Sequence, residues 1–167
     1  MTDRAVFGRR YTSFQPAGSE VYLLNGSAVT TSPSSTTEFV AGAALLQGEA
    51  VYVSGTFVLP ATAALGSDPT EFNAIGLTAA AAGVSEPVPV VLDDVAVVSD
   101  ANITADTELV PGEYYFLSKF AGQITRISTA SGLVDASDDY LASVVLGQAL
   151  STTELKVEVE PPVVLVP

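Results

Sequence analysis

The stretch VPGEYYFLS at residues 110–118 opens a segment that runs to residue 160 and has a counterpart earlier in the chain. The counterpart, LQGEAVYVS at residues 46–54, shares the Gly-Glu pair, the apolar residues after it and the closing serine. The correspondence continues in the same order, with GQITRI at 122–127 against GTFVL at 55–59, VVLGQA at 144–149 against NAIGLT at 73–78, and LKVEVE at 155–160 in the place of PVPVVL at 87–92. This order predicts two copies of one β-module.

The apolar segments are short and are separated by Gly, Pro and Asp residues, which is typical of β-strands joined by turns. Residues 155–160 alternate strictly, so Leu155, Val157 and Val159 are predicted to face inward. Residues 114–117 are apolar throughout, which predicts a strand buried on both faces. Residues 87–92 contain two prolines, which cannot donate to a ladder, and are therefore predicted to form an edge or bulged strand. About ten such strands predict an all-β sandwich or barrel built from two similar tandem units.

The repeat and the linker composition divide the chain into four expected parts. Residues 1–37 are expected to form an N-terminal arm and a first hairpin, 38–98 a first β-unit, 99–160 a second β-unit and 161–167 a C-terminal tail. The two copies themselves, residues 45–92 and 109–160, are expected to share one sheet system.

Charge is distributed unevenly along the chain, whose net charge is −13. Eighteen of the nineteen acidic residues but only three of the six basic residues follow residue 10, which leaves that part at −15. A body of this charge repels a phosphate backbone, so nucleic-acid binding is not expected. The arm, by contrast, carries Arg4, Arg9 and Arg10 together with Phe7, Tyr11 and Phe14, a basic and aromatic composition that suits an acidic partner surface.

The side chains that most often carry catalysis are missing from the sequence. There is no His and no Cys, which removes the usual general base, the thiol nucleophile and most transition-metal sites. Acid pairs such as Asp93-Asp94 and the repeated Glu49 and Glu113 suit turns better than a glycosidase, and a structural cause is expected for the repeated glutamates. The cluster at 135–139 holds Asp135, Asp138 and Asp139; a solvated loop and a calcium site both remain open. We expect no enzyme, no cofactor and no metal site.

Targeting signals and membrane spans are not expected either. The first residues lack an apolar core of the kind found in signal peptides, and no apolar run approaches the roughly 20 residues that cross a bilayer. The absence of Cys is compatible with folding in a reducing compartment. The sequence therefore predicts synthesis in a reducing cytoplasm and no membrane partner.

The repeated module resembles small β-modules of tailed-phage virion proteins, namely capsid decoration (cement) proteins and head-fibre or tail-fibre subunits. The resemblance rests on residues 111–118, 122–127 and 144–155 and on the first copy at 48–92, about two thirds of the chain; residues 1–37 lie outside it. It implies a virion structural protein with no catalytic residues. The leading expectation is a cement protein on the outside of an assembled phage capsid, and the alternative is a fibre module that recognises host glycan.

Partners follow from that resemblance and from the exposed apolar tail. The expected partners are the major capsid protein and further copies of this chain, arranged as a homotrimer, because capsid lattices offer three-fold positions. Localisation would then be the virion, on the capsid surface. The residues expected to contact a partner are Arg4, Phe7, Arg9, Arg10, Tyr11, Phe14, Val163 and Leu165.

Overall fold

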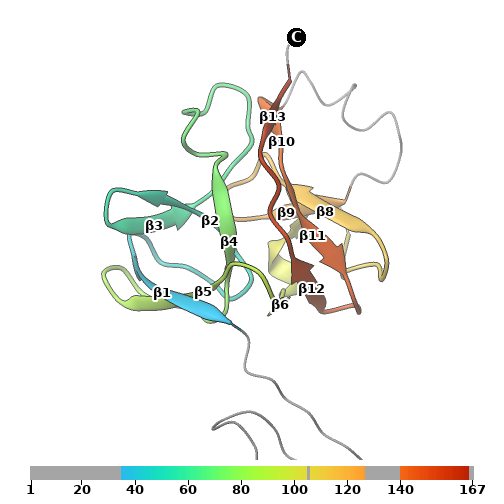
Figure 1. Ribbon diagram of the computed structural model, residues 1–167, viewed down its shortest axis with the longest axis horizontal. Helices are drawn as coiled ribbons and strands as arrows, with labels where there is room; N and C mark the ends of the chain where they lie inside the picture. Colours follow the sequence, from blue (N-terminus) through green and yellow to red (C-terminus); the bar gives the residue numbers. More distant parts are fainter. Residues whose placement is uncertain (1–34, 105, 127–139, 166–167) are drawn as a thin grey trace, which may run out of the picture. The chain divides into compact units, whose positions relative to one another are not determined.

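Two β-units account for the part of the chain that the computed structural model describes, which comprises residues 35–104, 106–126 and 140–165. The expected all-β class is confirmed (Figure 1). The first unit is a closed barrel of five strands in the order β1-β3-β2-β4-β5. Its strands are β1 (Thr36–Ala41), β2 (Ala50–Ser54), β3 (Phe57–Pro60), β4 (Ala74–Thr78) and β5 (Pro87–Val91).

The second unit is a six-stranded sheet in the order β6-β12-β11-β8-β9-β7. Its elements are β6 (Val95–Val97), a 3-10 turn η1 (Asp100–Asn102), β7 (Ile103–Thr104), β8 (Tyr114–Leu117), β9 (Ile124–Arg126), β11 (Val145–Ala149) and β12 (Glu154–Val157). A separate two-stranded ladder joins β10 (Ala142–Ser143) to β13 (Val163–Val164). β6 lies within residues that the sequence assigned to the first unit, yet it pairs with β12 of the second.

Four strands of each unit follow the same spatial order, as expected for two similar tandem units. The run β3-β2-β4-β5 in the barrel corresponds to β9-β8-β11-β12 in the second sheet, in the same sequence of repeat segments. In the barrel, β1 pairs in parallel with β3 and antiparallel with β5. In the second unit two separate strands make the pairings that β1 makes alone in the barrel. β7 pairs in parallel with β9, and β6 pairs antiparallel with β12. The turn η1 separates β6 from β7 and interrupts the strand that would close a second barrel.

The repeated strand glycines have a common physical cause. Gly76 on β4 lies opposite Val51 on β2, and Gly147 on β11 lies opposite Tyr115 on β8, each beside an irregularity in the ladder. A Cβ atom on Gly76 would collide with the carbonyl oxygen of Val91, and one on Gly147 with that of Lys156. In each unit the last strand of the repeat, β5 or β12, therefore approaches the glycine so closely that no side chain fits.

The units share one hydrophobic core, although the expected common sheet system is wrong. Buried side chains of both units, among them Leu77, Tyr115 and Leu146, form a single cluster. Backbone hydrogen bonds also cross between the units: Ala50 N donates to Gly122 O at 2.9 Å, and Gly122 N donates to Ala61 O at 2.8 Å. A second cluster fills the barrel and contains Ala41, Leu45, Val51, Val58, Val88 and Val90.

Two strand predictions are wrong. β5 is not an edge strand, since it pairs with β1 on one side and β4 on the other. Pro89 O accepts a hydrogen bond from Ala79 N, just past the end of β4. The nitrogen and oxygen of one strand residue point to the same side, so the proline nitrogen, which has no hydrogen to donate, faces a region where β4 has already ended. The proline is therefore tolerated in this strand. β8 is not buried on both faces, because Tyr114 is 51% exposed. The predicted inward face of 155–160 is confirmed at Leu155 and Val157, both fully buried, and the strand ends there.

Candidate functional site

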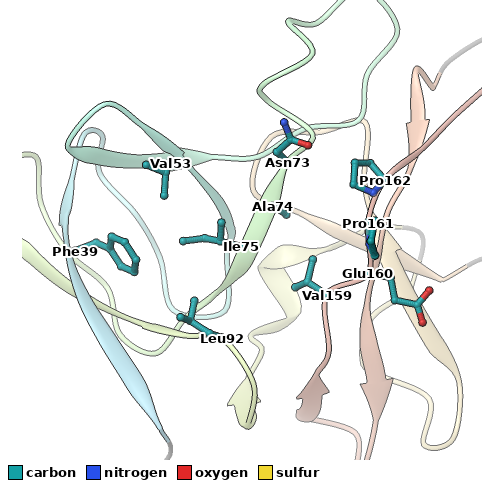
Figure 2. Close-up of a pocket in the computed structure, with 10 residues that line it drawn as sticks. All are labelled: Phe39, Val53, Asn73, Ala74, Ile75, Leu92, Val159, Glu160, Pro161 and Pro162. Carbon is teal, nitrogen blue, oxygen red and sulfur yellow. The ribbon is translucent and has the colours of Figure 1, made fainter.

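An apolar groove lies at one open end of the barrel. Its volume is about 560 Å³, and the residues that line it are Phe39, Val53, Asn73, Ala74, Ile75, Leu92, Val159, Glu160, Pro161 and Pro162. Figure 2 shows Phe39, Val53, Ile75 and Leu92 converging from the barrel strands, with residues 159–162 on the far side of β4. We call the four converging side chains the barrel mouth.

Strand geometry explains why the barrel mouth is apolar. Val53 lies two residues beyond the buried Val51 on β2, so both side chains point to the same face of the strand. Phe39 and Ile75 pack against the cluster that fills the barrel. The mouth is thus the outermost layer of the barrel interior, and it is only partly covered: Val53 is 42% and Leu92 36% exposed.

One acidic residue lines the groove, across β4 from the barrel mouth, and another follows Leu92 closely in the sequence. Glu160 lines the groove and is exposed. Asp94 lies two residues after Leu92, and its carboxylate accepts hydrogen bonds from Ser35 N and Val95 N, both at 2.8 Å. These hydrogen bonds, in that order of importance, hold the pKa of Asp94 below its usual value. The groove lies on a body whose part after residue 10 has a net charge of −15.

The C-terminal tail presents apolar side chains while its backbone is paired. β13 forms an antiparallel ladder with β10, and Leu165 N donates to Leu141 O at 2.9 Å. The side chains of Val163 and Val164 are nevertheless 63% and 55% exposed. Of the two tail residues predicted to contact a partner, Val163 is thus available on the surface and Leu165 is half-buried.

The predicted contact residues of the arm, Arg4, Phe7, Arg9, Arg10, Tyr11 and Phe14, lie outside the described residues. The aspartates of the predicted calcium alternative, Asp135, Asp138 and Asp139, lie outside them as well. Within the described ranges no group of three or more acidic side chains is placed to hold a metal ion. The same part of the chain contains no helix long and apolar enough to cross a membrane.

Two basic side chains on the body, Arg126 and Lys156, form ion pairs. Arg126 donates through Nε and Nη2 to the two carboxylate oxygens of Asp106, each at 3.1 Å, and through Nη1 to Glu113 at 3.4 Å. Lys156 Nζ donates to Asp93 at 2.7 Å. These pairs raise the pKa of both bases, with the hydrogen bond to the aspartate as the largest cause. Asp93 and Glu113 therefore have structural partners, as expected for turn residues.

Glu49 has a different environment from its counterpart Glu113. Its side chain is buried at the junction of the two units, where Gly122 approaches it so closely that a Cβ atom there would collide with the carboxylate. Leu46 N donates to Glu49 Oε2 at 2.7 Å. Burial raises the pKa of Glu49, and the hydrogen bond from Leu46 opposes that shift. The contact with the turn of the second unit supports a structural role, as the repeat predicted.

No protein-family model matches this chain, and no curated protein sequence is significantly similar to it. The residues of the barrel mouth were not recognised in the sequence. Phe39, Val53, Ile75 and Leu92 are ordinary inward-facing strand residues by their alternation, and nothing local distinguishes the open end of a barrel from its filled middle. Only the closure of the barrel shows which layer is left uncovered.

Proposed function

We propose that this protein is a virion structural protein, a capsid cement protein that binds the outside of an assembled phage capsid and stabilises the contacts between coat subunits. The observation that carries the proposal is the surface of the body, where apolar side chains stand exposed on ordered strands. Val163 and Val164 on β13 are the clearest case, since their backbone is paired and their side chains remain uncovered. Exposed apolar groups held on rigid elements are typical of surfaces that a partner covers.

Stabilisation by such a protein follows from mass action. A protein that binds the assembled lattice and not the separate coat subunits stabilises the lattice by its own binding free energy. A rigid β-body suits this task, because little conformational entropy is lost when a preformed surface docks. The repeated module, with its resemblance to phage virion modules, supports the assignment to a capsid. The homotrimer and the virion location rest on that resemblance.

The experiment is co-sedimentation of the purified protein with undecorated capsids. We expect the full chain to bind, and a chain lacking residues 1–17 to bind more weakly while the β-body stays folded by circular dichroism. Val163→Thr with Val164→Thr should weaken capsid binding or self-association, because Thr keeps the strand preference and removes apolar surface. Val97→Thr is the matched control, since Val97 is a strand valine with 46% exposure elsewhere.

The alternative, a fibre module that binds host glycan, is favoured by one observation. Tyr114 and Phe120 are each 51% exposed, and exposed aromatic rings are common in sugar-binding sites. A stable monomer that ignores capsids, binds a host polysaccharide and loses that binding on Tyr114→Ala would replace the cement proposal with this one.

A further inference from the structure

Among the described residues, the barrel mouth is an apolar layer that the rest of the barrel covers only in part. Deeper in the same barrel Val51, Val58, Val88 and Val90 are fully buried. One layer further out, Val53 and Leu92 remain more than a third exposed, and the groove of about 560 Å³ opens beside them. Binding of an apolar side chain in such a groove is favourable, because each Å² of apolar surface removed from water contributes about 25 cal/mol.

The occupant should also carry positive charge. Glu160 lines the groove, Asp94 lies two residues beyond Leu92, and the part of the chain after residue 10 has a net charge of −15. The basic residue nearest in sequence to Glu160 is Lys156, which already pairs with Asp93. An aromatic segment with flanking arginines would place rings in the mouth and guanidinium groups against the acidic surface of the body, because Arg binds carboxylates well.

One segment of this chain has that composition. Residues 1–17 contain Phe7, Tyr11 and Phe14 between Arg4, Arg9 and Arg10, half of all basic residues in the protein. Seventeen residues, 18–34, separate the segment from the body and can span roughly 55 Å when extended at about 3.3 Å per residue. That reach is ample for contact with another molecule.

We propose that the barrel mouth binds the amino-terminal arm, residues 1–17, of a second copy of this chain. The mouth takes an aromatic side chain of the arm, and the acidic body, which carries −15 after residue 10, attracts its arginines. Each copy thereby offers one arm and one mouth, a head-to-tail contact that closes into a ring when the rotation allows. This inference deepens the homo-oligomer part of the proposed function, and it concerns the isolated protein without capsids.

The test uses the full chain and two of its sequence properties. The chain has no Cys, so Gln15→Cys gives a unique site for a nitroxide beside Phe14. It has four isoleucines, of which Ile75 lies in the barrel mouth while Ile103 and Ile124 are buried away from it. A copy that carries the nitroxide and no isotope is mixed with a copy that carries ¹³C-methyl isoleucine and no nitroxide. We expect loss of the Ile75 methyl signal in this mixture, with the signals of Ile103 and Ile124 retained.

Three variants locate the contact. Val53→Lys adds a positive charge to the mouth and should weaken self-association in sedimentation by at least about tenfold, because a charge in an apolar groove is costly and repels the arginines. Val97→Lys places the same charge on a similarly exposed strand valine and should leave the association unchanged. Ser in place of Phe7, Tyr11 and Phe14 should abolish both the self-association and the loss of the Ile75 signal, while the β-body stays unchanged.

The opposite results are equally clear. An Ile75 signal that persists in the mixture, or that is lost only when spin label and isotope are on the same chain, overturns binding to a second copy. Loss of the signal that survives Val53→Lys moves the contact away from the mouth. An Ile75 signal that changes only when capsids are added would show that the groove binds the coat protein and not a second copy. Capsid co-sedimentation is measured separately. The proposed function is therefore tested by that result alone, even if the arm does not bind the mouth of a second copy.

Discussion

Replacing Gly76 or Gly147 by Ala tests the physical reason for the repeat. In each unit the new Cβ atom would lie closer than 3.0 Å to a backbone carbonyl oxygen, a distance that real Cβ atoms essentially never show. Backbone cannot rotate away as a flexible side chain can, so the neighbouring strand, β5 or β12, must move. Overpacking of this kind costs about 1–3 kcal/mol. Lost ladder hydrogen bonds add about 1 kcal/mol each.

We therefore expect Gly76→Ala and Gly147→Ala each to lower the free energy of unfolding by about 3 kcal/mol, a large part of the roughly 5–15 kcal/mol of a typical domain. The melting temperature should fall by about 6–12 °C at about 2–4 °C per kcal/mol. Urea unfolding followed by far-ultraviolet circular dichroism measures the loss directly. Because one hydrophobic cluster spans both units, both variants should shift the same single transition.

Two other glycines are the matched controls. Gly55 and Gly112 have φ values of +63° and +90°, and a Cβ atom on either would meet nothing within 4 Å. Their replacement by Ala should cost only the backbone strain, about 1–2 kcal/mol. The reasoning fails if Gly76→Ala costs no more than Gly55→Ala, or if two separate transitions appear and each glycine shifts only one of them.

Two further predictions concern acidic groups. Burial raises the pKa of Glu49 above its ordinary 4.5, so above that pH the folded state binds more protons than the unfolded state and stability falls as pH rises. Glu49→Gln can still accept from Leu46 N and should be more stable than the parent at pH 7, with a flatter dependence between pH 4.5 and 7; a less stable variant in urea titrations would contradict this. The melting temperature should be the same in EDTA and in calcium, whereas a rise of many degrees with calcium would assign a site to Asp135, Asp138 and Asp139.

The sequence by itself determined the class of fold and its duplication. Short apolar segments between turn residues require strands, and the glycine at the same place in each copy, Gly76 and Gly147, records a close approach of backbone that every copy of the module must accommodate. These are local requirements, so they are visible in one dimension. The alternation at Leu155 and Val157 correctly gave the buried face for the same reason.

Only the tertiary structure decided which strands are neighbours and what is left uncovered. The prolines of β5 indicate an edge locally, yet barrel closure gives that strand two partners because the side that lacks a donor falls beyond the end of β4. Tyr114 belongs to an apolar run and is nevertheless half exposed, because its side chain points to the face of β8 opposite that of the buried Tyr115. The barrel mouth depends most completely on tertiary structure: Phe39, Val53, Ile75 and Leu92 lie far apart in sequence, and closure of the barrel alone brings them together at its open end.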